Sequence, residues 1–128
     1  MEHAPECTFD SSRFPIASNK LSPFNSQNTF FKSTILPDYF MFPFVGRMDD
    51  IWAAYYVQAK NFKVVYGAAS VYQKRNAHDL TQDMRKEYAG YENNLKMVND
   101  LAKNAEAIKS YLPENTMKAW DLYRRHFK

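Results

Sequence analysis

The chain has 128 residues, of which 45% are hydrophobic and 16% aromatic, and its formal net charge is +3. This length suffices for one domain with a buried core, and the even spread of basic and acidic residues excludes the basic patch typical of a nucleic-acid-binding protein. The chain has no run of about 18 apolar residues and no secretory leader, and its single cysteine, Cys7, fits a reducing compartment, so we expect a soluble protein and favour the cytoplasm.

Residues 1–27 lack periodicity and are rich in Ser, Pro and Asn, which predicts an extended N-terminal arm. The segment 22–29 carries many amide and hydroxyl groups, which supply the neutral donors and acceptors that sugar hydroxyls need. Turn chemistry alone also enriches loops in Asn and Ser. The candidate substrate-binding residues of this segment are Asn25, Gln27 and Asn28. We expect residues 28–128 to form a single α+β domain.

A helix is predicted over 49–60, and it is aromatic and apolar almost all round. Such a helix is buried on most of its circumference, so its acidic tip is expected to face a cleft, with Asp50 and Asp49 as candidate catalytic acids. The alternative is that these acids only cap the helix and complement its dipole. Arg47 and Trp52, on either side of the acids, are candidate substrate-binding residues.

Short strands are predicted over 63–66 and 70–73 from β-branched and aromatic residues. The polar turn that follows holds Arg75, which can fork onto phosphate or carboxylate oxygens, and Asn76, a second candidate substrate-binding residue. His78 is the candidate metal ligand or proton carrier. Asp79 can cap the next helix, and the alternative for the whole segment is a polar turn with such a cap.

From Leu80 the apolar residues recur at steps of three or four, which predicts a helix near 80–110, either continuous or broken near Gly90. We expect this stripe to be scaffold, and the alternative is a functional face such as a cofactor box or a partner helix. Proline at the start predicts a last helix over 114–126. The apolar residues assigned to the stripe are Leu80, Met84, Tyr88, Tyr91, Leu95, Val98, Ala102, Ala105, Ile108 and Leu112, and those assigned to the last helix are Met117, Trp120, Leu122, Tyr123 and Phe127. The fold class is therefore α+β, dominated by helix, with few short strands.

Three ordered segments carry a resemblance to a known family. They are Ser-Pro-Phe-Asn-Ser-Gln-Asn-Thr at 22–29, Gly-Arg-Met-Asp-Asp-Ile-Trp at 46–52 and Tyr-Gln-Lys-Arg-Asn-Ala-His-Asp at 72–79. Together they resemble the STELLO-like glycosyltransferases, known in plants as Golgi proteins. The resemblance covers roughly residues 21–100. It implies a GT-A type fold, in which a Rossmann-like sheet holds the sugar nucleotide and an acceptor-side half follows, and this chain resembles that C-terminal, acceptor-side half.

The resemblance also implies roles for individual residues. Asp50 matches the acid of the family's Gly-Arg-x-x-Asp-Ile-Trp signature, which would bind or deprotonate the acceptor hydroxyl, and His78 would help to hold a divalent metal. Arg75, Asn76 and His78 match its Arg-Asn-Ala-His signature. Two positions depart from the family, because Ala53 replaces a common arginine and Asp79 stands where asparagine is common. The first departure removes a cation and puts identical substrate handling in doubt.

The donor site is incomplete in this sequence, which contains no Asp-x-Asp pair and no glycine-rich phosphate loop. The implied partners are a sugar nucleotide, a carbohydrate acceptor and a donor-binding half or separate chain, and Mn²⁺ or Mg²⁺ would bind with the sugar nucleotide only when that half is present. A piece of a membrane-anchored enzyme would lie in the Golgi lumen. A degenerate relative without catalysis is a further alternative, and so is a non-catalytic interaction module that uses the aromatic-rich first half.

Overall fold

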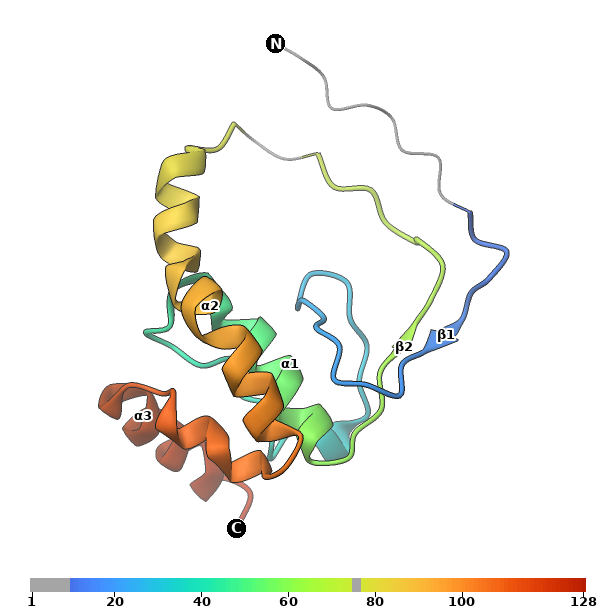
Figure 1. Cartoon of the computed structure of the whole chain (residues 1–128). Coiled ribbons are helices and arrows are strands. Elements are labelled where there is room, and N and C mark those ends of the chain that lie inside the picture. The colour runs from blue at the N-terminus through green and yellow to red at the C-terminus, as the bar shows by residue number, and fades with distance from the viewer. Residues whose placement is uncertain (1–9, 75–76) are drawn as a thin grey trace.

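The computed structural model describes residues 10–74 and 77–128 (Figure 1). Within these residues the fold is helix-dominated and contains one short two-stranded sheet. Among the described residues, none of the helices combines the length and apolarity that crossing a bilayer requires. The elements in chain order are β1 (Ile16–Ala17), η1 (Ser33–Ile35), η2 (Gly46–Met48), α1 (Asp49–Ala59), β2 (Val65–Tyr66), α2 (Leu80–Leu101), η3 (Ala105–Ser110) and α3 (Glu114–Arg125).

The sheet ties the N-terminal arm to the segment that follows α1. Strand β1 pairs antiparallel with β2, and Ile16 lies opposite Tyr66. The strand predicted over 63–66 is confirmed at its last two residues, whereas the strand predicted over 70–73 is wrong, because that segment makes no ladder. Further along the arm, the backbone N–H of Ser22 donates to Oε1 of Gln58 on α1 (3.0 Å). A side-chain amide therefore holds the chain where the backbone ladder ends.

The core forms around α1, which is buried on most of its circumference as predicted. The ring of Trp120 from α3 meets Phe42 and Tyr56 edge to face, with ring centroids 5.2 and 5.0 Å apart. Aromatic pairs of this geometry each contribute about 0.5–1.5 kcal/mol beyond the area that they bury. Met97 and Leu101 from the C-terminal part of α2 close the same cluster. The first turn of α1 is thus attached to a rigid support.

The helix boundaries follow the sequence closely except in one place. The helices predicted over 49–60 and 114–126 are confirmed by α1 and α3. The helix predicted over 80–110 ends at Leu101, and η3 follows after a turn in which the Asn104 side chain accepts the N–H of Glu106 (3.0 Å). Asn104 has an extended backbone, with φ −154°, which stops the preceding helix and caps the next one. Gly90 does not break α2; it lies in the middle of that helix.

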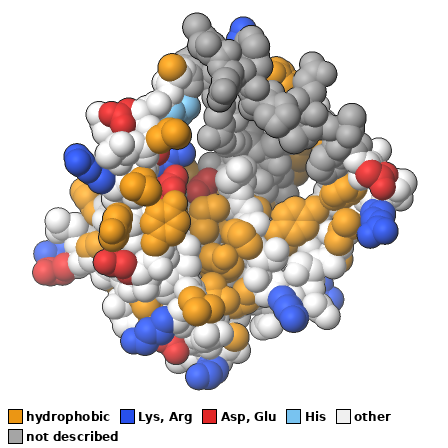
Figure 2. All heavy atoms as spheres, turned by 45° about the horizontal axis from the view of Figure 1, so that its top comes forward, with side chains coloured by type: hydrophobic (Ala, Val, Ile, Leu, Met, Phe, Trp, Pro, Cys, Tyr) orange, Lys and Arg blue, Asp and Glu red, His pale blue; other side chains and the backbone are white. Residues whose placement is uncertain are grey.

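The half of the apolar stripe that runs from Leu80 to Leu95 does not pack in the core, whereas Ile108 and Leu112 at its other end are buried. Leu80 and Leu95 are 78% and 80% exposed, and Met84, Tyr88 and Tyr91 are also exposed. The buried residues of this helix are instead Gly90, Met97 and Leu101. Leu122 and Phe127, which were assigned to the core, are exposed. Figure 2 shows hydrophobic side chains (orange) at the surface among charged groups.

Candidate functional site

Asp50 connects the start of α1 to the loop 22–29. Its Oδ2 accepts two hydrogen bonds from Ser26, one from the backbone N–H (2.8 Å) and one from the hydroxyl (3.1 Å). The neighbouring Asp49 accepts the N–H of Asp50 through its Oδ1 (3.0 Å), which is a local helix-start contact. The two acids therefore differ: Asp49 satisfies a backbone group of its own helix, and Asp50 reaches a loop 24 residues earlier in the chain.

Tyr39 has no local sequence signal that would select it as a site residue, apart from its place in an aromatic-rich segment. Its ring is 8% exposed and packs on Phe31, with centroids 4.9 Å apart. Its hydroxyl makes no hydrogen bond within the described residues. Burial, together with the charges of Asp50 and Asp49, raises the pKa of Tyr39 to about 12, so the hydroxyl keeps its proton at neutral pH. A buried donor thus lies in the field of both acids without a partner.

Two surface hollows lie beside the loop 22–29, and Asp50 itself lines neither of them. The larger, of about 990 Å³, is lined by Asn25 and Asn28 from the loop and by Ile51 next to Asp50. The smaller, of about 470 Å³, is lined by Ser26 and Tyr39. The other residues around the two hollows mix aliphatic and polar side chains with several aromatic ones, including Phe24, Phe30, Phe31, Phe40 and Phe62. Amide groups beside aromatic faces can hold a ligand that has both hydroxyl groups and apolar C–H faces.

The loop itself has a mixed character. Oδ1 of Asn25 accepts the N–H of Gln27 (3.2 Å), which is the local turn chemistry that such sequences often provide. The amide of Asn28 instead donates to the hydroxyl of Ser70 (3.1 Å), beyond strand β2. The loop is therefore held from both sides, by Ser70 and by Asp50.

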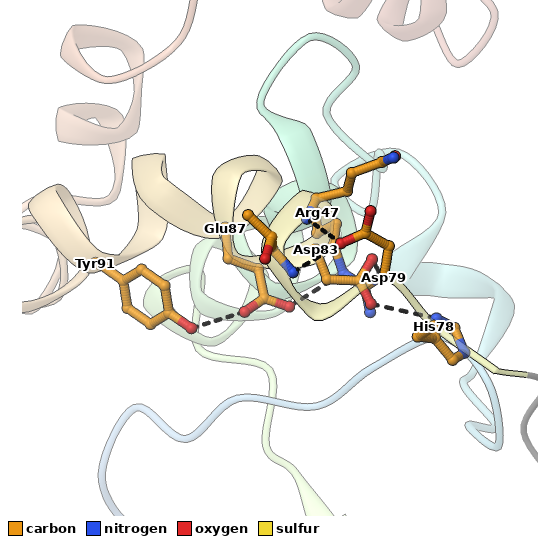
Figure 3. A network of polar contacts seen from close by, with 8 residues as sticks. Arg47, His78, Asp79, Asp83, Glu87 and Tyr91 are labelled. Atoms are coloured by element: carbon orange, nitrogen blue, oxygen red, sulfur yellow. Dashed lines mark hydrogen bonds and ion pairs between the residues drawn. The ribbon is translucent and has the colours of Figure 1, made fainter.

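Arg47 joins η2 to the N-terminal half of α2 (Figure 3). Its Nη1 lies 2.8 Å from Oδ1 of Asp83, and its Nε lies 3.1 Å from Oε1 of Glu87. Nδ1 of His78 lies 3.2 Å from the other oxygen of Asp83. The guanidinium of Arg47, predicted to bind substrate, thus holds α2 in place, and His78 attaches the end of the preceding segment to the same carboxylate. Asp79 caps α2, as predicted, by accepting the N–H groups of Thr81 and Gln82.

Trp52 is buried, and its indole N–H donates to Oδ1 of Asn94 on α2 (2.7 Å). The structure thus gives this predicted substrate-binding residue a supporting contact between α1 and α2. Arg75 and Asn76 lie outside the described residues. No group of three or more His, Cys, Asp or Glu side chains with metal-binding geometry occurs in the ranges 10–74 and 77–128.

The three polar segments of the sequence meet through these contacts. Ser26 of the first segment binds Asp50 of the second, and Arg47 of the second binds Asp83, which also holds His78 of the third. No direct interaction joins Asp50 to His78 in the described structure, and the connection between them runs through Arg47. No family model, curated protein or solved structure matches this chain in the comparisons with known proteins.

Proposed function

We propose that this chain is the acceptor-side portion of a metal-dependent glycosyltransferase that uses a sugar nucleotide, and that Asp50 binds the acceptor hydroxyl. The three segments that resemble the STELLO-like family are its sequence basis. The observation that carries the proposal is the contact between Ser26 and Asp50, because it joins the amide-rich loop to the acid at the tip of a buried helix. A purely capping acid would have no reason to hold a loop so distant in the sequence.

The proposed site offers the sugar one hydrogen-bond acceptor, the Asp50 carboxylate, and one hydrogen-bond donor, the Tyr39 hydroxyl. The Asp50 carboxylate has lone pairs beyond those that Ser26 uses, and it can take the proton of a sugar hydroxyl as that oxygen attacks the donor carbon. The unpartnered Tyr39 hydroxyl is a donor that stays protonated. A carbohydrate hydroxyl group both donates and accepts hydrogen bonds. We therefore propose that a sugar hydroxyl binds Asp50, and that the Tyr39 hydroxyl, which is buried in the described structure, becomes its second partner when the side chains that cover it move aside.

The donor half of the reaction is proposed to come from outside these 128 residues. A divalent metal would neutralise the charge that builds on the leaving diphosphate, and His78 is the residue of this chain proposed to contribute to its binding. In the structure His78 is paired with Asp83. Metal binding would require His78 to exchange that partner for the ion, or both side chains to bind it together.

The proposal is tested by carbohydrate binding to the purified chain. Saturation-transfer NMR would be recorded with a panel of gluco-, manno-, galacto- and xylo-oligosaccharides. We expect at least one of them to bind, and Asp50→Asn to weaken that binding about tenfold or more, a change of roughly 1.4 kcal/mol. Asp121→Asn, at an exposed acid on α3, is the matched control and should leave binding unchanged. Absence of binding across the panel, or equal binding by Asp50→Asn, would contradict the proposal.

A non-catalytic interaction module is the second candidate, and one observation favours it. Phe30 is 95% exposed and Phe44 is 68% exposed. Phe44 also has a backbone φ of 64°, and a strained conformation of this kind is found preferentially at functional sites. Under this alternative, Asp50→Asn would have no effect on any ligand, whereas Phe30→Ser and Phe44→Ser would weaken the binding of a protein partner.

A further inference from the structure

Within the described structure, α2 carries more exposed large apolar side chains than any other helix, and they form a stripe along it. Its five members follow one line along the helix and are all more than half exposed, namely Leu80 (78%), Met84 (53%), Tyr88 (56%), Tyr91 (67%) and Leu95 (80%). At 1.5 Å per residue the line is about 22 Å long. The rings of Tyr88 and Tyr91 meet edge to face, with centroids 6.5 Å apart, in the middle of the line. Contiguous apolar patches of this extent mark interaction sites.

The orientation of α2 is fixed by contacts on another side of the helix. Arg47 holds Asp83 and Glu87, and Gly90 accommodates the side chain of Met48 so closely that a Cβ at that position would lie 2.3 Å from the sulfur. At 3.6 residues per turn, the buried line through Gly90 and Met97 lies roughly 130° around the helix from the exposed stripe. The helix therefore cannot rotate its apolar stripe into the core without breaking these contacts.

The charges beside the stripe indicate what can cover it. Arg85 and Glu92 follow the stripe on the same flank, both are exposed, and neither forms an ion pair within the described structure. In an antiparallel pair of identical helices, residues on the same flank of the two copies meet across the seam. In one antiparallel register, Met84 lies opposite Leu95 of the second copy and Tyr88 lies opposite Tyr91. This register also brings Arg85 of each copy next to Glu92 of the other, so that two ion pairs form.

The parallel arrangement is disfavoured by the same residues. In a parallel pair, a residue on one flank of the apolar stripe meets a residue on the other flank in the second copy. Glu87 of each copy would then lie against Glu92 of the other, which gives two like-charge contacts. Like charges in such positions are repulsive. Full coverage of the five side chains would bury roughly 700 Å² per chain, which is close to the roughly 800 Å² per partner of a standard stable interface. The positions of the charged residues and the size of the apolar area are thus both consistent with a second copy of the chain as the partner.

We propose that the exposed face of α2 is a self-association surface, on which two copies of the chain pair their α2 helices antiparallel about a two-fold axis near Ala89 and Gly90. Such an interface is isologous, because the same patch contributes from both chains. The Tyr88 and Tyr91 rings of the two copies form its centre, where aromatic residues contribute most to binding energy. This assignment concerns α2 alone and does not depend on the proposed function at Asp50.

Sedimentation velocity on the full chain, from about 5 to about 500 µM, measures the association. We expect a monomer–dimer equilibrium with a Kd below about 100 µM. Leu95→Glu, which places a charge in the seam, should abolish the dimer, whereas Leu122→Glu, at an exposed leucine of α3, should not. A chain that stays monomeric to the highest concentration would overturn the proposal and assign the face to a different partner. Equal association by Leu95→Glu and the wild type would overturn it as well.

A charge-reversal series tests the antiparallel register. Arg85→Glu and Glu92→Arg should each weaken the dimer about tenfold, because each turns two attractions into two repulsions. The double variant should recover most of the wild-type Kd. Lys103→Glu, at an exposed residue beyond α2, is the control for net charge. Circular dichroism would confirm that every variant is folded. Single variants without an effect, or a double variant no tighter than the singles, would contradict the antiparallel pairing.

Discussion

Ser26 donates two hydrogen bonds to one carboxylate oxygen of Asp50, from its backbone N–H (2.8 Å) and from its hydroxyl (3.1 Å). Hydrogen bonds to a charged group are stronger than those between neutral groups. The pair therefore fixes the position of the loop 22–29 relative to the first turn of α1. The second oxygen of Asp50 accepts no hydrogen bond from the described residues, and the charge of the same carboxylate acts on the unpartnered hydroxyl of Tyr39.

Tyr39→Phe should separate stability from ligand binding. The substitution removes a buried hydroxyl that has no partner, so the free energy of unfolding at neutral pH should stay unchanged or rise by up to about 1 kcal/mol. Binding of the carbohydrate should weaken about fivefold or more, because the proposed donor is lost. Chemical denaturation and saturation-transfer NMR measure the two effects, and Tyr72→Phe, at an exposed tyrosine, is the control. A large loss of stability together with unchanged carbohydrate binding would show that the hydroxyl has only a structural role.

The same hydroxyl predicts a dependence of stability on alkaline pH. The pKa of Tyr39 is raised from 10.0 to about 12 in the folded state, so the folded protein keeps a proton that the unfolded chain loses. This contribution to stability is complete below pH 10 and is lost as the pH rises through about 12. Unfolding curves between these pH values should therefore be less steeply pH-dependent for Tyr39→Phe than for the wild type. Identical pH dependence would contradict the role of Tyr39.

Gly46→Ala should destabilise the fold strongly, whereas Gly67→Ala should not. Gly46 has φ +67°, and a Cβ there would lie 2.0 Å from the backbone oxygen of Lys86 on α2. We expect a loss of roughly 2–4 kcal/mol in the free energy of unfolding. Gly67 has no atom within 4 Å of such a Cβ, and its substitution should change stability by less than about 0.5 kcal/mol. Equal effects in thermal denaturation would show that η2 does not pack on α2 as described.

A comparison of Trp52→Phe with Trp120→Phe measures how much one buried hydrogen bond contributes to the free energy of unfolding. Both side chains are buried, but only Trp52 has a hydrogen-bond partner, Asn94, for its indole N–H within the described residues. Trp52→Phe should therefore cost about 1–2 kcal/mol more than Trp120→Phe, because Oδ1 of Asn94 is left without its donor. In the Asn94→Ala background this difference should largely disappear. If the difference persists in the Asn94→Ala background, the larger loss of stability in Trp52→Phe comes from packing and not from the hydrogen bond.

The isolated chain should show no sugar transfer. The Asp-x-Asp pair with which most GT-A enzymes hold metal and nucleotide is absent from its sequence, so the leaving diphosphate would have no site that stabilises its charge. Release of nucleoside diphosphate from a panel of sugar nucleotides with Mn²⁺ measures this activity. Turnover that exceeds hydrolysis without protein, and that Asp50→Asn abolishes, would show that these 128 residues hold a complete active site.

The sequence predicted α1 and α3 well because their limits are encoded locally. Two acids begin α1, and proline precedes the first residue of α3. It also selected Asp50, because an acid that opens an apolar helix is a strong local signal. The polar turn before α2 contained Asp79, whose role as a cap is confirmed. These features depend on neighbours within a few residues, which a single sequence displays directly.

The rest depends on contacts between distant segments. The periodicity of α2 identified an apolar face, but it could not show that a second and narrower face, through Gly90 and Met97, packs in the core. Arg47 contacts α2 beside its buried face, and its partners lie 36 and 40 residues later, at Asp83 and Glu87. Tyr39 was missed for the same reason. Nothing near it in the sequence indicates that it lies close to the acids of α1.

Amide chemical-shift mapping tests whether a carbohydrate hydroxyl binds at Asp50 and Tyr39. The isotope-labelled chain would be titrated with the oligosaccharide that binds most tightly in the saturation-transfer panel. We expect the largest shifts at the amides of Ser26, Tyr39 and Asp50, and we expect Asp50→Asn to abolish them. Shifts confined to α3 or to the exposed face of α2, with Ser26 and Tyr39 unchanged, would contradict binding at this site.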